Sequence, residues 1–215
     1  MDLSSYRNEY LKGTLRKADL KPDPYDQFEV WMRAAIEAKV HEPNAFVLGT
    51  CGKDGRPSQR VVLCKGFDRR GVVFYTNLGS RKARQMAENP LVSGHFFWAQ
   101  MERQVSVIGR VERVSTTEAL KYFLSRPRES QLGAWASRQS EVVSTRSLLE
   151  GKLADLKARF MHGEVSMPEF WGGFRIVPES FEFWQGGAAR IHDRFLYSPR
   201  LEDGGTVWDI ARLSP

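Results

Sequence analysis

The alternation of apolar and polar residues along the chain is mostly that of short β-strands. Runs of this kind are separated by turn sequences such as GKDGRP and DRRG. They cover residues 45–51, 58–67, 72–77, 91–100, 103–114, 174–185 and 206–215, and EDGG precedes the last run. The pattern predicts an antiparallel barrel with hairpin connections, because the βαβ alternation of a doubly wound sheet is missing.

One further stretch, WQGGAARIHDRFLY at residues 184–197, predicts a strand with an unusual face. Arg190, His192 and Arg194 alternate there with other residues, so a strand would place all three on one side. Neighbouring cationic groups repel each other unless an anion or an electron-rich ligand lies across them. A solvated edge strand that is protected by charge is the alternative interpretation.

Helical spacing of apolar residues occurs in a few segments around these strands. The predicted helices are residues 25–43, 115–127 and 144–160, and a helix that begins after Ser80. The second of them starts with a capping box from Ser115 to Glu118 and ends at Pro127. The sequence therefore predicts a mainly β fold with peripheral helices, of the α+β class.

Length and composition favour one folded domain with a polar extension. The chain has 215 residues, of which 41% are hydrophobic and 27% are charged, and this is too apolar for a disordered protein. We expect a single domain over residues 25–215. Residues 1–24 are polar and end in KPDP, which predicts a mobile N-terminal arm, with a disordered tail as the alternative.

Charge and cysteine content narrow the range of partners and locations. The net charge of +6 and the isoelectric point near 9.4 indicate an anionic partner, such as nucleic acid, a membrane surface or a phosphorylated small molecule. Cys51 and Cys64 fit neither a zinc site nor a disulfide framework, so we expect no metal site and a cytoplasmic location. No apolar segment has the length of a membrane span or the character of a signal peptide.

The first candidate anion site is the helix after Ser80. Arg81, Lys82 and Arg84 lie in its first turns, where positive charge opposes the helix dipole. A phosphate bound at the helix N-terminus would remove this conflict, whereas a solvated basic helix is the alternative. Side chains would have to hold any phosphate, because the glycine-rich motifs of dinucleotide-binding and P-loop proteins are missing.

Two further groups of side chains are candidates for anion binding. Arg60 and Lys65 are five residues apart, so they serve one site only if the strand bends; otherwise they are surface charges. Tyr122 and Arg126 are one helical turn apart, and Ser130 follows just beyond the helix end. Hydroxyl and guanidinium groups in that arrangement suit a phosphate monoester, and a tyrosine packed on an arginine stem is the alternative.

Several long motifs resemble one known family. RVVLCK, FYTNLGSRKA, ERQV, YFLSRPRESQLGAW, SRQS, FWGGFR and FWQGG followed by HDRFLY match, in order and spacing, the pyridoxamine/pyridoxine 5′-phosphate oxidases. The resemblance runs from about Arg7 to the C-terminal RLSP. Ala188 and Ala189 depart from the polar residues that are frequent at these positions in the family.

The resemblance implies an FMN-binding split β-barrel and a homodimer with FMN at the subunit interface. The implied reaction oxidises pyridoxine 5′-phosphate or pyridoxamine 5′-phosphate to pyridoxal 5′-phosphate. A hydride equivalent would pass from substrate C4′ to flavin N5, and O2 would then accept the electrons and leave as H2O2. Neither nucleic acid nor a membrane is expected as a partner.

The motifs also imply which residues form the site. FMN binding falls to Arg60, Val61, Val62, Leu63, Cys64, Lys65, Tyr75, Thr76, Arg81, Lys82, Gln104, Gln139, Ser140, Trp184 and Arg194. Substrate binding falls to Arg7, Asn8, Glu9, Tyr10, Lys65, Tyr122, Arg126, Ser130, Arg190, Ile191 and His192. Arg190 and His192 would lie over the pyridine ring as the catalytic pair, and the sequence leaves open whether His192 acts as a base.

Two other function classes fit parts of the sequence. A nucleic-acid-binding barrel would use the basic balance and the aromatic residues as stacking platforms. An FMN-binding split barrel that does not oxidise vitamin B6 would share the fold and the flavin. The group formed by Tyr122, Arg126 and Ser130, together with Arg190 and His192, argues against the second of these classes, and the family resemblance favours the oxidase over both.

Overall fold

A computed structural model describes residues 1–215, and its centre is one nine-stranded antiparallel sheet. The strand order is β2-β1-β5-β6-β7-β4-β3, with β8 paired to β7 and β9 paired to β8. The strands are β1 (Ala45–Cys51), β2 (Pro57–Leu63), β3 (Gly66–Asp68), β4 (Gly71–Asn77), β5 (Leu91–Trp98), β6 (Arg103–Arg113), β7 (Trp171–Gln185), β8 (Asp193–Glu202) and β9 (Gly205–Leu213). The predicted strand-rich, antiparallel architecture is thus confirmed.

The long strand β7 joins the two halves of the sheet. It pairs with β6 along its length, with β4 through its first half and with β8 through its last residues. The register with β6 shifts between Ile108 and Gly109, where a β-bulge bends the strand. A Cβ on Gly109 would lie 2.1 Å from the carbonyl oxygen of Val177, so only glycine permits this close approach.

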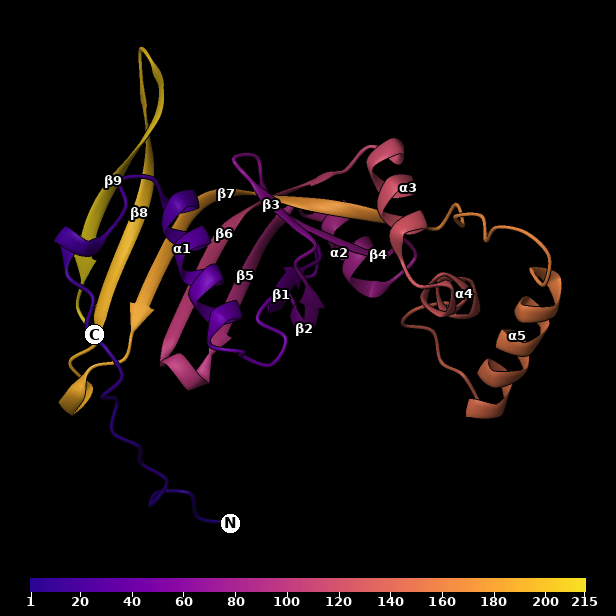
Figure 1. The fold of residues 1–215 in the computed structure, drawn as a ribbon, viewed down its shortest axis with the longest axis horizontal. Coiled ribbons are helices and arrows are strands. Elements are labelled where there is room, and N and C mark those ends of the chain that lie inside the picture. Colours follow the sequence, from indigo (N-terminus) through magenta and orange to yellow (C-terminus); the bar gives the residue numbers. More distant parts are fainter.

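The helices lie around the sheet rather than within it (Figure 1). They are α1 (Pro24–Glu37), α2 (Arg81–Glu88), α3 (Thr116–Ser125), α4 (Arg128–Ala136) and α5 (Arg146–Arg159), with short 3-10 turns at Lys17–Asp19, Ala99–Met101 and Ala188–Arg190. Helix α4 was not predicted, because Pro127 ends α3 and at the same time is the N-cap residue of α4. None of the helices has the length and apolar character needed to cross a membrane.

Two apolar clusters stabilise this arrangement. The larger one fills the barrel with aromatic residues such as Phe46, Phe96 and Phe183, and α1 adds Phe28 and Trp31. The smaller one lies under α3, α4 and α5 and includes Phe123, Leu132 and Trp171. Each fully buried side chain of this size contributes roughly 1.5–3 kcal/mol relative to an exposed one. The second cluster therefore holds the helices of the α3–α5 region against β4 and β7.

The prediction of a strand through residues 188–192 is wrong. Residues Ala188–Arg190 form a 3-10 turn, and β8 begins only at Asp193. Ala189 and Arg190 have positive φ angles of 53° and 65°, which are incompatible with an extended strand. Arg190, His192 and Arg194 therefore do not share a strand face, because hydrogen bonds within the turn replace those of a sheet ladder.

The second half of the N-terminal segment contacts the barrel. Leu15 is buried, and its amide donates to a carboxylate oxygen of Asp193 at 2.8 Å. The Tyr197 hydroxyl donates to the carbonyl oxygen of Lys21 at 2.8 Å. Residues 1–9 are exposed, and the chain reaches the barrel at Tyr10. The segment thus runs along β8 before α1 begins.

Candidate active site

A cavity of about 590 Å³ opens between β2, β4 and the α3–α4 junction. Its lining consists of Arg60, Val61, Val62, Leu63, Lys65, Tyr75, Thr76, Lys82, Tyr122, Arg126, Pro127, Ser130, Gln139 and Trp171. Twelve of these fourteen residues are among the site residues that the sequence suggested, and they span the chain from Arg60 to Gln139. The lining contains four cationic side chains and no carboxylate.

Arg60 and Lys65 line the same cavity although five residues separate them. Strand β2 ends at Leu63, so Lys65 is outside the regular alternation that would place the two on opposite faces. The Lys65 amide instead donates to the carbonyl oxygen of Val73 on β4 at 2.8 Å. The chain thus bends after β2, and because of this bend Arg60 and Lys65 can serve one site.

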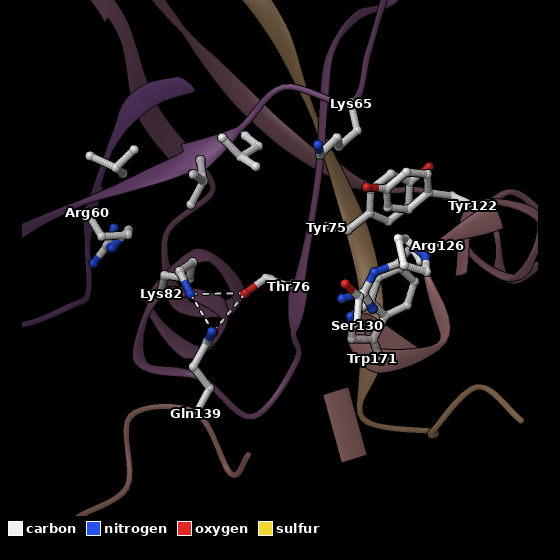
Figure 2. Close-up of a pocket in the computed structure, with 14 residues that line it drawn as sticks. Arg60, Lys65, Tyr75, Thr76, Lys82, Tyr122, Arg126, Ser130, Gln139 and Trp171 are labelled. Carbon is white, nitrogen blue, oxygen red and sulfur yellow. Dashed lines mark hydrogen bonds between the residues drawn. The ribbon is translucent and has the colours of Figure 1, made fainter. Parts of the chain in front are cut away.

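Lys82 lies buried at one end of the cavity, where α2 begins. Its ammonium group donates to Thr76 Oγ1 at 3.0 Å and to Gln139 Oε1 at 2.6 Å (Figure 2). No carboxylate contacts it, and burial together with the charge of Arg60 lowers the pKa of Lys82 to about 8. The Ser80 hydroxyl accepts from the amide of Ala83 and caps the helix, as predicted.

Arg60 shares this end of the cavity and also has no acidic partner. Its guanidinium donates to the carbonyl oxygen of Leu48 at 3.0 Å and to the hydroxyls of Thr50 and Ser58 at 2.7 and 2.6 Å. Burial, followed by the charge of Arg81, lowers the pKa of Arg60. Two cations held by neutral groups in a partly buried place are a favourable setting for a phosphate.

Tyr122, Arg126 and Ser130 form the opposite end of the cavity (Figure 2). Arg126 Nη1 is buried and has no hydrogen-bond partner in the protein. Its guanidinium lies 5.1 Å from the ring centroid of Trp171, and burial lowers its pKa. Ser130 lies in the first turn of α4 and lines the same end of the cavity. A buried guanidinium donor without a partner is therefore part of this end of the cavity, which makes it a second candidate anion site.

Stacked aromatic rings lie at the Arg126 end of the cavity (Figure 2). Tyr75 stacks on Tyr122 with ring centroids 4.1 Å apart, and on Trp171 with centroids 5.3 Å apart and nearly parallel planes. A Cβ on Gly173 would lie 2.7 Å from the Tyr75 ring, so the stack depends on this glycine. Burial raises the pKa of both tyrosines, which keeps their hydroxyls neutral and able to donate hydrogen bonds.

A second group of suggested residues lies away from this cavity. Tyr10 packs edge-on against Trp184 and His192, with centroids 5.6 and 5.3 Å apart, and the Arg190 guanidinium lies 5.3 Å from the Tyr10 ring. Gln104 and Arg194 flank Trp184 on the neighbouring strands. In Figure 1, the β7–β8 connection is at one end of the molecule and α4 is toward the other. One protomer therefore does not bring the two groups together.

The remaining suggested residues have other surroundings. Cys64 is buried, its thiol donates to the carbonyl oxygen of Gly66, and burial raises its pKa to about 11. The Arg81 amide donates to the hydroxyl of Ser140 at 3.2 Å next to the Lys82 end. Arg7, Asn8 and Glu9 are exposed, as is Ile191.

The sequence interpretation did not single out Pro127 and Trp171, which also line the cavity. Trp171 precedes the Gly172-Gly173 pair in the motif FWGGFR. An aromatic residue followed by two glycines is a signal for close packing of rings against backbone, so this residue could have been found.

Comparisons with known proteins cover the whole chain. The family model described as pyridoxamine 5′-phosphate oxidase matches residues 32–160, and the one described as the pyridoxine 5′-phosphate oxidase C-terminal dimerisation region matches residues 171–215. A pyridoxine/pyridoxamine 5′-phosphate oxidase of Sodalis glossinidius is 54% identical over 215 residues, which are 100% of this chain and 98% of that protein. A protein of the same name from Escherichia coli K12 is 54% identical over 213 residues, 99% of this chain and 96% of that one.

Solved structures agree with this assignment. PhzG from Burkholderia lata, in complex with tetrahydrophenazine-1-carboxylic acid, has a TM-score of 0.86 and 30% identity over 94% of this chain and 98% of its own. A pyridoxamine 5′-phosphate oxidase-related, FMN binding protein of Nostoc punctiforme has a TM-score of 0.70 at 15% identity, over 90% and 98% of the two chains, and supports the fold alone. The chain therefore belongs to the pyridoxine/pyridoxamine 5′-phosphate oxidase family, and its fold is the FMN-binding split β-barrel.

Proposed function

We propose that this protein oxidises pyridoxine 5′-phosphate and pyridoxamine 5′-phosphate to pyridoxal 5′-phosphate, with FMN as cofactor and O2 as electron acceptor. The observation that carries the proposal is a cavity with cations at both ends, no carboxylate, and stacked aromatic rings beside Arg126. Such a site suits two phosphates and flat rings, as FMN and a pyridine phosphate provide. Cys51 and Cys64 are free thiols, which agrees with a reducing compartment, and we place the enzyme in the cytoplasm.

The Lys82 end of the cavity fits the phosphate of FMN. Lys82 and Arg60 have lowered pKa values because of burial first, and then because of the charge of Arg60 beside Lys82 and that of Arg81 beside Arg60. A dianionic phosphate would reverse both effects and add charge-assisted hydrogen bonds. Val61, Val62 and Leu63 continue the wall beside Arg60 and offer an apolar surface for a flavin ring. We therefore assign FMN binding to this half of the cavity.

The opposite end fits the phosphate of the substrate. Arg126 supplies a guanidinium donor that the protein leaves unsatisfied, and Tyr122 and Ser130 supply hydroxyls beside it. Lys65 lies between the two ends in Figure 2 and can contact either ligand. A phosphate held away from the reacting carbon positions the substrate without taking part in the chemistry.

We further propose that two protomers complete each active site. The region that matches the C-terminal dimerisation model contains β7, β8 and β9, and with them Trp184, Arg190, His192 and Arg194. These residues lie away from the cavity of their own protomer. In a homodimer with twofold symmetry, this group from one protomer would cover the cavity of the other. The Tyr10 segment, packed on Trp184 and His192, would move with it.

The residues then take separate tasks in the reaction. When bound, FMN would supply the redox chemistry, which is acceptance of a hydride equivalent from substrate C4′ and return of two electrons, with two protons, to O2 as H2O2. Arg190 would orient the pyridine ring and stabilise charge, and His192 would hold the substrate in place. The rings of Tyr75, Tyr122 and Trp171 exclude water from the cavity wall.

An anaerobic half-reaction tests the proposal directly. The protein is reconstituted with FMN, mixed with pyridoxine 5′-phosphate without oxygen, and the flavin absorbance is followed before and after air is admitted. We expect the absorbance to bleach and then recover, with pyridoxal 5′-phosphate formed. Pyridoxine without the phosphate is the matched control and should bleach the flavin far more slowly at the same concentration. If flavin binds but neither B6 phosphate bleaches it, the proposal is wrong and the protein is an FMN-binding protein with another function.

A further inference from the structure

The turn between β7 and β8 holds the His192 ring by one of its two nitrogens. The amide of Gly187 donates a hydrogen bond to His192 Nδ1 at 3.1 Å. Two backbone hydrogen bonds close the same turn, from Ile191 to Ala188 and from His192 to Arg190, each at 3.0 Å. A Cβ on Gly187 would lie 2.1 Å from the carbonyl oxygen of Ile191, so the contact requires glycine. The Nδ1 contact is therefore built into the backbone of the turn.

Neighbouring rings fix which way the imidazole faces. Trp184 lies 4.6 Å from the His192 ring centroid, and Tyr10 packs edge-on at 5.3 Å. A flip of the ring would place Cδ2 against the Gly187 amide, which would then have no acceptor there. The observed orientation is thus the one that satisfies the amide, and it leaves Nε2 as the nitrogen free to contact a ligand.

We propose that His192 is held as its Nε2–H tautomer and acts on the substrate as a hydrogen-bond donor, not as a proton-accepting base. A neutral imidazole has one protonated nitrogen, and Nδ1 accepts from Gly187, so the proton is on Nε2. A nitrogen that carries a proton cannot accept another. The assignment rests on the proposed function, because it takes the B6 phosphate as the partner of Nε2.

The surroundings of His192 disfavour a proton on both ring nitrogens. Partial burial, and then the guanidiniums of Arg190 and Arg194, lower the pKa of His192 below its usual value. Tyr10 from the N-terminal segment and Trp184 from β7 pack their rings against it. A proton added at Nδ1 would break the contact with the Gly187 amide, because both groups would then be donors. The lowered pKa and the hydrogen bond from Gly187 therefore both disfavour proton uptake by the His192 ring.

Nitrogen-15 NMR of histidine-labelled protein without FMN tests the tautomer. The chain has four histidines, and the pair of signals missing in His192→Gln identifies His192, with His162→Gln at an exposed position as control. We expect an unprotonated, hydrogen-bonded Nδ1 and a protonated Nε2 at neutral pH. A protonated Nδ1 would overturn the proposal. This measurement needs no turnover, so its result stands even if the wild-type protein fails to oxidise either B6 phosphate.

Kinetics of the same variants test the role on the substrate. The glutamine amide offers an N–H at the position of Nε2 but does not bind a proton, so His192→Gln should keep kcat within about tenfold of wild type. His192→Ala removes the donor and should lose more, and His162→Ala should be unchanged. A loss of about 10²- to 10⁴-fold in His192→Gln, equal to that in His192→Ala, is the result expected of a general base and would refute the donor role.

Discussion

Replacement of Arg126 by alanine separates a phosphate-binding arginine from one that only packs on aromatic rings. Arg126 Nη1 is buried without a partner, and the guanidinium lies over Trp171. A hydrogen bond to a charged group is worth about 1.5–3 kcal/mol, and about 1.4 kcal/mol corresponds to a tenfold change in an equilibrium constant. We therefore expect KM for pyridoxine 5′-phosphate to rise roughly 10- to 150-fold on these values. The phosphate is bound equally in the ground and transition states, so kcat should change little.

The stability of the ligand-free protein should respond differently from KM. Arg126→Ala removes a buried charge that the protein does not satisfy, and this relieves a desolvation cost. It also removes the stacking on Trp171, worth about 0.5–1 kcal/mol. Because the two effects oppose each other, we expect the free energy of unfolding to fall by less than about 1 kcal/mol.

Steady-state kinetics and denaturant unfolding of the FMN-free protein give the two numbers. Lys121→Ala is the matched control, because it removes one positive charge from the exposed face of the same helix, α3. KM and stability should both be unchanged in this control. Arg126→Ala with KM within twofold of wild type, or with a stability loss of several kcal/mol, would refute the assignment of Arg126 to phosphate binding.

Three further predictions address other parts of the site. The first concerns Lys82, whose pKa is lowered from 10.5 to about 8, so that between these pH values the folded FMN-free protein binds fewer protons than the unfolded chain. The free energy of unfolding, measured by urea titration, should therefore rise with pH across this window, and Lys82→Met should abolish the rise. The second concerns Gly173→Ala, which forces a Cβ into the stacked rings; it should weaken FMN and substrate binding in a flavin titration and lower the stability by about 1–3 kcal/mol in calorimetry. The control Gly133→Ala meets no atom within 4 Å, so its stability should be unchanged or higher. The third mixes the Arg126→Ala and Arg190→Ala proteins, which are unfolded together and refolded. If two protomers build each site, half of the dimers are mixed and each mixed dimer has one intact site, so about a quarter of wild-type activity should return at low substrate concentration. No gain over the separate variants would argue for sites within one protomer.

The sequence by itself determined the local elements where side chains carry the local signal. Alternating apolar positions predicted the strands that the structure forms, and the capping residues Ser80 and Ser115 start α2 and α3 as expected. The charges at the start of α2 also pointed to an anion, because their conflict with the helix dipole is visible within a few residues. Motif order then identified the family without any knowledge of contacts.

Local patterns failed where backbone geometry departs from regular periodicity. The alternation at residues 188–194 looked like a strand, but positive φ angles at Ala189 and Arg190 close a 3-10 turn instead. Helix α4 was missed because a proline that ends one helix also starts the next. In both places, a few hydrogen bonds within the turn decide the path of the chain, and residue periodicity does not record them.

The tertiary structure alone decided which charges share a site. Folding places Gln139 against Lys82 and Thr76, although 57 and 63 positions separate them in the sequence. It also leaves Arg126 Nη1 without a partner and separates His192 from the cavity. Burial, desolvation and the loss of a hydrogen-bond partner depend on what surrounds an atom in space, and the sequence specifies these surroundings only through the complete packed fold.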